Sequence, residues 1–297
     1  MVIYQTHGRG VVIGGHGYHY QTQVATKEPT WVRYVLIVVA VGFMFVMLVI
    51  PLLAVFYEAL KSGWQLYLAS LTESEALHAI KLTLITAFIV VPINAVIGVA
   101  VAWLLTRFEF KGKQIVTTLL DIPFSVSPVV AGLMFVVLLG QNSWLGGWLQ
   151  YFGVQVIFAL PGIVIATMFV TFPFVVREIM PLMQSQGASE EQAALTLGAS
   201  GWQMFYRITL PNIKWALLYG MILTNARAMG EFGAVSVVSG HIRGQTNTMP
   251  LLVEIAYNEY NFTAAFALSS LLASLALITL LLQQFLSYQQ RKKQLAM

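Results

Sequence analysis

The sequence predicts an all-α integral membrane protein with six transmembrane helices. Of its 297 residues, 58% are hydrophobic and only 9% are charged, whereas soluble domains carry about 25% charged residues. The mean hydropathy is +0.76. The chain has no cysteine, so neither a disulfide framework nor a thiolate metal site is available. Membrane lipid is therefore the expected environment of most of the chain.

Six segments are apolar enough to cross a bilayer, whose hydrocarbon core of about 30 Å needs about 20 residues of helix. The first is nearly uncharged and no small-residue cleavage site follows it, so we expect a retained span rather than a secretory signal. The expected spans are Arg33–Tyr57, Ile80–Thr106, Leu119–Gly140, Val156–Met180, Lys214–Ser239 and Phe262–Leu286.

The distribution of positive charge predicts that both termini are cytoplasmic. Of the 16 Lys and Arg residues, 12 lie in segments that alternate spans place on the same side as the termini. Three lie on the other side, and Arg227 lies within a span. Because cytoplasmic loops carry an excess of Lys and Arg, the link between the fourth and fifth spans is expected in the cytoplasm.

Four regions follow from these spans: a flexible cytoplasmic tail (1–30), a first transmembrane helix (31–58), a five-helix core (75–287) and a basic cytoplasmic tail (288–297). His7, His16 and His19 raise the alternative of a metal site in the first tail. We interpret that tail as flexible, because it has too few aliphatic residues to form a core. The uncharged, aromatic stretch 141–155 predicts an interfacial helix or a re-entrant turn.

Several kinds of site are absent from the sequence. The only Gly-Lys pair, at Gly112, lacks both the hydroxyl residue and the glycine spacing of a nucleotide-binding P-loop. No two histidines lie within spans, which argues against bis-imidazole haem ligation. No Ser/His/Asp set and no metal-ligand cluster is evident. We therefore expect a protein that is not itself an enzyme.

Residues 188–212, between the fourth and fifth spans, predict two short capped helices. Ser189 and Gln192 fit a capping box that starts the first helix, and Ser200 and Gln203 fit a second box of the same form. Gly198 is expected to end the first helix in the left-handed conformation. A proline then restricts the residue before it, so the second helix is expected to end at Pro211.

The second of these helices carries three aromatic residues on one face. Trp202, Phe205 and Tyr206 follow the i, i+3, i+4 spacing of a helix. An aromatic face of this kind is suited to the groove of a partner protein. The alternative is that the three rings pack under the spans of the chain itself.

The pattern Gln192-Ala-Ala-x3-Gly198-x9-Ile208-x-Leu210-Pro211 resembles the cytoplasmic signature of ABC importer permeases, EAA…G…I-LP. The resemblance covers about residues 75–287 and implies the type I ABC importer (MetI/ModB-like) permease fold. It also implies that the two helices couple the permease to an ATPase. Gln192 stands where the family has Glu, which removes one possible salt bridge, and Glu191 is a possible substitute. The implied coupling residues are Ser189, Glu191, Gln192, Ala193, Ala194, Gly198, Ala199, Ser200, Trp202, Phe205, Tyr206, Arg207 and Pro211.

A second motif, NARAMGEFGAVSVVSG at Asn225–Gly240, resembles the sulfate/molybdate-type permeases, and His241–Phe262 resembles their CysW-type subunits. The resemblance implies an ATP-driven importer of sulfate or thiosulfate. Its implied partners are a related, CysT-like sister permease, a CysA-like ATPase dimer and a periplasmic binding protein for the anion. No nucleic-acid partner is expected, and no cofactor in this chain; ATP and magnesium are expected in the ATPase. The alternatives are a molybdate/tungstate permease, a transporter driven by an ion gradient and a respiratory membrane subunit.

Two stretches are candidates for the pathway of the anion. Arg227 and Glu231 lie four residues apart in the fifth span, where ionisable residues usually face a cavity or a bundle interior. Two roles remain open for them: a positive potential for a passing anion, or an ion pair that fixes helix packing. The prolines at 123 and 128 predict a helix break near the start of the third span. The candidate pathway residues are Ser125, Ser127, Asn225, Arg227, Glu231 and Ser236.

Overall fold

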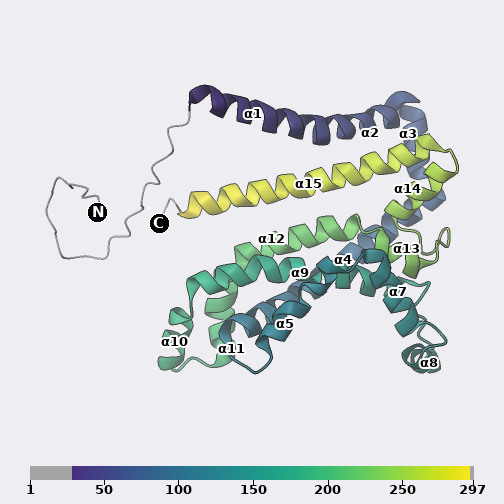
Figure 1. The fold of residues 1–297 in the computed structure, drawn as a ribbon. Helices are drawn as coiled ribbons and strands as arrows, with labels where there is room; N and C mark the ends of the chain where they lie inside the picture. The colour runs from purple at the N-terminus through teal and green to yellow at the C-terminus, as the bar shows by residue number, and fades with distance from the viewer. Residues whose placement is uncertain (1–28, 295–297) are drawn as a thin grey trace, which may run out of the picture. The chain divides into compact units, whose positions relative to one another are not determined.

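The computed structural model describes residues 29–294, with side chains for residues 29–287, and all regular structure in this range is helical (Figure 1). The predicted first tail, apart from its last two residues, and the side chains of the predicted basic tail lie outside the described residues. The helices are α1 (Thr30–Met44), η1 (Phe45–Val49), α2 (Ile50–Lys61), α3 (Trp64–Thr72), α4 (Ser74–Arg107), α5 (Lys113–Leu119), α6 (Ile122–Ser125), α7 (Pro128–Leu139), α8 (Trp144–Tyr151), α9 (Leu160–Gln186), α10 (Ser189–Thr196), α11 (Gly201–Met204), η2 (Phe205–Thr209), α12 (Leu210–Met229), α13 (Gly233–Ser239), α14 (Met249–Asn258) and α15 (Phe262–Gln294).

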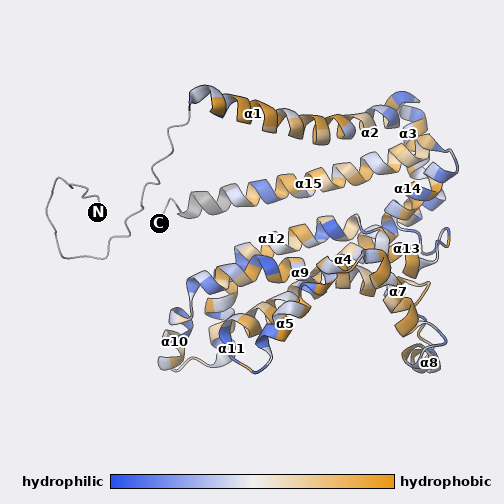
Figure 2. Cartoon of the chain, in the orientation of Figure 1, coloured by the Kyte–Doolittle hydropathy of each residue, from blue (hydrophilic) through white to orange (hydrophobic). Residues whose placement is uncertain are grey.

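The chain divides into two parts, Met1–Pro51 and Leu52–Met297, which are described separately. In the first part, α1 and the π turn η1 form an almost entirely apolar helix that buries none of its residues (Figure 2). A helix that is apolar on every face is suited to lipid. This agrees with the predicted first span, which the helix extends as far as Lys61.

Four helices in the described residues are long and apolar enough to cross a membrane: Thr30–Lys61, Ser74–Arg107, Leu160–Gln186 and Phe262–Ser287. A fifth crossing is possible if Lys113–Ser125 and Pro128–Leu139, which meet at a bend of 108°, count as one broken span. The third and fifth predicted spans are therefore not the continuous helices that hydropathy suggested. The total of six spans, and the orientation of the termini, stay predictions.

The first break separates α6 from α7 and confirms the one that the prolines predicted. Pro123 lies in the first turn of α6 and Pro128 opens α7. The hydroxyl of Ser125 donates at 3.0 Å to the carbonyl of Asp121, which also accepts from the amides of Phe124 and Ser125. Non-helical backbone at membrane depth is tolerated where protein or a cavity surrounds it.

The second break, at residues 230–232, separates α12 from α13 and was not predicted. The two breaks lie against each other, since a methyl group added to Gly233 would lie 2.9 Å from Cβ of Pro128. A methyl group on Gly132 would lie 2.7 Å from the carbonyl oxygen of Ala234, so α7 and α13 approach backbone to backbone. We call this contact the break junction.

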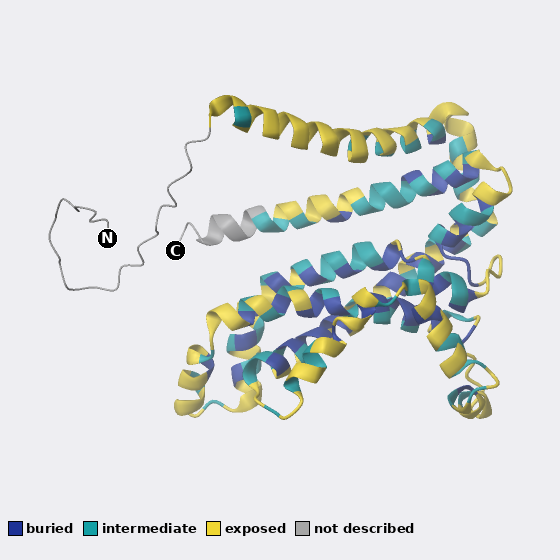
Figure 3. Cartoon of the chain, in the orientation of Figure 1, coloured by how far each residue is buried: buried dark blue, intermediate teal, exposed yellow. Residues whose placement is uncertain are grey.

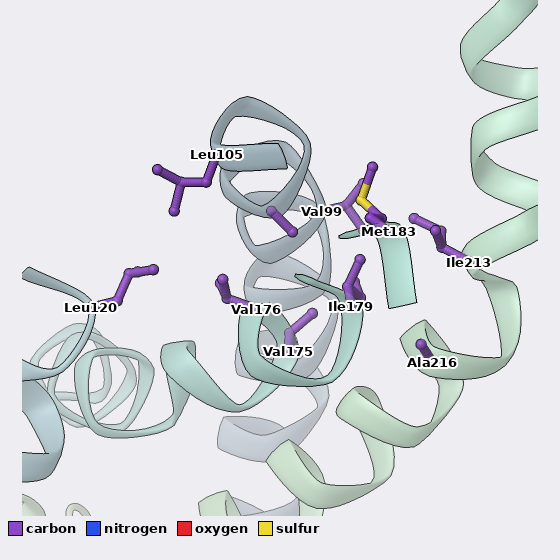
Figure 4. Close-up of a cluster of buried hydrophobic side chains, with 10 residues drawn as sticks. Val99, Leu105, Leu120, Val175, Val176, Ile179, Met183, Ile213 and Ala216 are labelled. Carbon is purple, nitrogen blue, oxygen red and sulfur yellow. The ribbon is translucent and has the colours of Figure 1, made fainter. Parts of the chain in front are cut away.

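The core of the second part lies where α4, α9 and α12 pack together (Figures 1 and 3). Its largest buried cluster joins these three helices and Leu120, the residue after α5 (Figure 4). Lipid provides no hydrophobic drive for helix association, so the helices depend on close packing, which small residues at their contacts allow. The cluster consists of Val99, Ala102, Leu105, Leu120, Val175, Val176, Ile179, Met183, Ile213 and Ala216.

Replacing Gly98 by leucine is expected to disrupt this packing. A Cβ at Gly98 would lie 2.6 Å from Cγ1 and 2.7 Å from Cβ of Val175 on α9, so α4 and α9 would have to separate. Overpacking of this kind costs about 1–3 kcal/mol or more. The thermal midpoint and the monodisperse fraction of the purified protein should both fall. Gly42→Leu on α1, where an added Cβ meets nothing within 4 Å, is the control; an equal effect of both variants would contradict the packing argument.

Candidate functional site

The helical hairpin of residues 188–212, hereafter the hairpin, begins one residue earlier than the sequence predicted. The N-cap of α10 is Ala188, whose carbonyl accepts from the amide of Gln192 at 2.9 Å, and Ser189 makes no capping hydrogen bond. The predicted first capping box is therefore wrong. Gln192 is exposed and does not reach back to the helix start. Because the helix starts at this position, Glu191 faces inward and forms a buried ion pair, and the helix start has no side-chain cap.

Gly198 ends α10 as predicted. Its φ of +87° is in the left-handed region, which only glycine adopts without strain. The amide of Ala199 donates to the carbonyl of Ala194, and that of Gly198 donates to the carbonyl of Leu195, both at 3.0 Å. This pair of bonds is the Schellman motif, which satisfies the last carbonyls of the helix. The chain therefore reverses at a fixed angle between α10 and α11.

The second capping box is confirmed. Ser200 Oγ accepts from the amide of Gln203 at 3.3 Å, while the Gln203 side chain accepts from the amide of Ser200 at 2.9 Å. The predicted helix end at Pro211 is wrong, because the π turn η2 carries α11 directly into α12. Proline lacks an N–H and its ring crowds the carbonyl four residues earlier. The wider winding of a π turn just before Pro211 accommodates both effects.

The aromatic face of the second helix exists and is mostly exposed. Trp202 and Tyr206 stack with ring centroids 5.7 Å apart, and 71% and 60% of their surfaces are exposed. Phe205 instead is partly buried and lies 5.2 Å from the ring of Trp103 on α4. One of the three rings therefore packs on the chain's own span, and two are presented outward; docking of these two to a partner stays a prediction. Arg207 beside them is also exposed.

Glu191 does not take the outward position that a substitute for the family's Glu would need. It is the only buried residue of α10, and its carboxylate pairs with Nε of Arg107 at 2.5 Å. Thr209 also donates to it, at 2.7 Å. No sequence motif indicated Arg107 or Thr209 as partners of Glu191, because they lie 84 and 18 positions away in the chain. Among the remaining predicted coupling residues, Ala193 is exposed and Ala194 and Ala199 are partly buried.

The predicted pathway residues lie around the two breaks. Arg227, in the last turn of α12, pairs with Glu231 at 2.9 Å, which confirms the predicted pair. The Glu231 side chain is fully buried and its other oxygen accepts from the amide of Ala234 at 3.0 Å, so it also holds the start of α13. The Arg227 side chain remains 36% exposed.

The polar residues near this pair are placed differently from one another. Ser125 and Ser127 are exposed beside the break junction, whereas Asn225 and Ser236 are partly buried. The Ser236 hydroxyl donates to the carbonyl of Gly233 at 2.9 Å and is used locally. Within residues 29–287, no group of three or more His, Asp or Glu side chains is placed to hold a metal ion. The three tail histidines lie outside this range.

Comparisons with known proteins place this geometry in a family. The family model for "Binding-protein-dependent transport system inner membrane component" matches residues 96–292, which include the hairpin and both breaks. The chain is 52% identical to the sulfate transport system permease protein CysW of Escherichia coli (strain K12), over 87% of this chain and 89% of the relative. It is 35% identical to the sulfate transport system permease protein CysT of the same strain, over 80% of this chain and 86% of that one.

Solved structures support the same fold. A bacterial alginate ABC transporter in complex with an alginate pentasaccharide-bound periplasmic protein contains a chain that matches with a TM-score of 0.72. The match covers 88% of this chain and 94% of that chain at 16% sequence identity, which bears on the fold alone. The resemblance drawn from the sequence motifs is thereby confirmed. The chain belongs to the family of inner-membrane components of binding-protein-dependent transport systems, among its CysW-type permeases.

Proposed function

We propose that this chain is the permease subunit of an ATP-driven importer of sulfate and thiosulfate, and that it forms half of the translocation pathway. The substrate class rests on the names of its relatives, which are sulfate transport permeases. The coupling role rests on one observation, the exposed rings of Trp202 and Tyr206 on a capped hairpin. A stacked aromatic pair of this size is the kind of anchor that fills a pocket at a protein interface.

Three partners complete the proposed importer. A CysT-like sister permease supplies the other half of the pathway, and a CysA-like ATPase dimer binds the hairpin and holds ATP and magnesium. A periplasmic binding protein delivers the anion. When the ATPase changes shape it moves the hairpin, and the spans alternate between inward-facing and outward-facing states. This chain itself supplies no nucleotide site to that cycle.

Affinity purification of the chain from native membranes, with partners identified by mass, tests this assembly. We expect a second, non-identical permease together with an ATPase. Purification with copies of this chain alone as the permease would favour the molybdate/tungstate alternative, whose permeases work as homodimers. Absence of any ATPase under conditions that preserve membrane complexes would instead favour a transporter driven by an ion gradient.

We further propose that the anion passes the break junction. The contact of the two breaks places the start of α7 beside the residues that lead into α13. Glu231 pairs with Arg227 through one carboxylate oxygen and accepts from the amide of Ala234 through the other. The guanidinium has five N–H donors and is partly exposed, so it can still donate to an anion. The exposed hydroxyl of Ser127 can add a weak neutral contact, which suits an ion that must also leave, whereas that of Ser125 already donates to Asp121.

A pair of variants separates this role from a packing role. Arg227→Gln leaves a buried carboxylate unpaired and is expected to lower both the folded yield and uptake. Arg227→Gln combined with Glu231→Gln removes both charges, so the yield should recover while sulfate uptake stays about tenfold low, the value of one charge-assisted hydrogen bond of about 1.5 kcal/mol. Arg227→Lys, which keeps the positive charge, is the control and should retain most uptake. Wild-type uptake by the double variant would show that the pair serves packing alone.

A further inference from the structure

A buried ion pair joins the hairpin to the C-terminal end of the long helix α4. Arg107 is the last residue of α4 and Glu191 lies in the first turn of α10, 84 positions later. Nε of Arg107 donates to Oε2 of Glu191 at 2.5 Å, and their side chains are only 11% and 9% exposed. Charged side chains are this well buried only when they are paired.

Each member of the pair also has a second partner on another helix. Nη1 of Arg107 donates to the carbonyl of Met183 near the end of α9 at 3.0 Å. The hydroxyl of Thr209, buried in η2, donates to Oε1 of Glu191 at 2.7 Å. The neighbouring Glu190 accepts from Asn212 at 2.6 Å. One network therefore connects α4, α9, α10 and the π turn that leads into α12.

The network is not a ligand site. The hollow beside it, bordered by both charged residues and by Asn212, has a volume of about 10 Å³. That is at most enough for one water molecule, whose site needs about 10–15 Å³. The charges therefore act on each other and on the helices that carry them.

Stability alone does not account for these charges. Burying an ion pair costs desolvation that its attraction barely repays, so apolar side chains would often serve as well. The pair is distinguished by its position in the hairpin, because Glu191 is the only residue that α10 buries. The first helix of the hairpin is thus held to the spans by a directed charged contact rather than by an apolar face. Such a contact fixes position and transmits displacement in both directions.

We propose that Arg107 and Glu191 are positioning residues that transmit movement of the hairpin to α4. This inference rests on the proposed function, in which the ATPase moves the hairpin. The helix α4 runs unbroken over 34 residues and packs along both α9 and α12. A displacement of α10 is passed through Glu191 to Arg107 and so to the whole span. Without the pair, the hairpin follows the ATPase while the spans do not.

The test is the number of sulfate ions imported per ATP hydrolysed in proteoliposomes that contain the complete complex. Glu191→Gln, Arg107→Gln and the double variant are compared, with Glu109→Gln, whose exposed pair with Lys113 is worth little, as the control. Each single variant should keep the ATPase bound and hydrolysis within about twofold, while the transport-to-hydrolysis ratio falls at least about fivefold, the lower end of usual coupling between sites. The control should retain the wild-type ratio.

The double variant makes the test independent of folding. Removing both charges avoids the unpaired buried charge of a single variant, so its folded yield should match the wild type. Because the two residues act through each other, its ratio should be no lower than that of either single variant. An unchanged ratio in the double variant, or single effects that simply multiply, would overturn the inference. A wild-type complex that hydrolyses ATP without importing sulfate would instead count against the proposed function.

Discussion

Replacing Gly198 by valine is expected to abolish most ATP-driven sulfate uptake while leaving the chain inserted in the membrane. Gly198 turns the chain between α10 and α11 at φ +87°, where a residue with a side chain is strained by about 1–3 kcal/mol. A β-branched residue lies at the upper end of that range. Relief of the strain breaks the two bonds that end α10 and misdirects the aromatic face. Uptake should fall at least about tenfold, since each 1.4 kcal/mol corresponds to a factor of ten.

The chain offers a matched control for this change. An added Cβ at Gly198 meets nothing within 4 Å, and the same is true of Gly201, which lacks a positive φ. Gly201→Val therefore adds the same side chain to the same hairpin without backbone strain, and should keep most uptake. Gly198→Asn, which tolerates the left-handed region, should be intermediate. Wild-type uptake by Gly198→Val would refute the assignment of the hairpin as the coupling element.

Replacing Trp202 by alanine is expected to release the ATPase from the membrane complex. The ring is 71% exposed and stacks on Tyr206, so its loss removes little packing within the chain. Central aromatic residues at interfaces cost about 2–4 kcal/mol when truncated to alanine, which corresponds to at least about 30-fold weaker binding. The measurement is the amount of ATPase that copurifies with the chain, together with the dissociation constant of the purified complex.

The control for this prediction is another exposed tryptophan. Trp144 on α8 is 87% exposed, and the same substitution there should leave the bound ATPase unchanged. Trp144→Ala thus separates a specific docking residue from a general effect of removing a surface ring. If Trp202→Ala and Trp144→Ala retained the ATPase equally, the aromatic face would have no part in docking.

Features set by local backbone chemistry were the ones that the sequence predicted well. The left-handed Gly198 and the Ser200 capping box depend on residues within one turn, and both are present. The break between α6 and α7 followed from two prolines. The helix end predicted at Pro211 was wrong, because a π turn precedes this proline and the helix continues through it.

Features set by distant partners were missed. The start of α10 is linked to the pairing of the Glu191 carboxylate with Arg107. Arg107 was not recognised as its partner, because membrane orientation already explains a positive charge at the end of a span. The break after α12 was hidden because a hydropathy window counts apolar residues and does not detect a change of helix axis. The Arg227–Glu231 pair was found because four-residue spacing is a local rule, but its link to α13 through Ala234 was not.

The most direct test of the account is uptake of labelled sulfate into proteoliposomes that contain this chain, its sister permease and the ATPase, with the binding protein added to the side that delivers substrate. The account predicts uptake that requires ATP and magnesium on the side of the ATPase, that stops when this chain is omitted, and that Gly198→Val suppresses. Sulfate uptake that continues without ATP and follows an imposed ion gradient would contradict it.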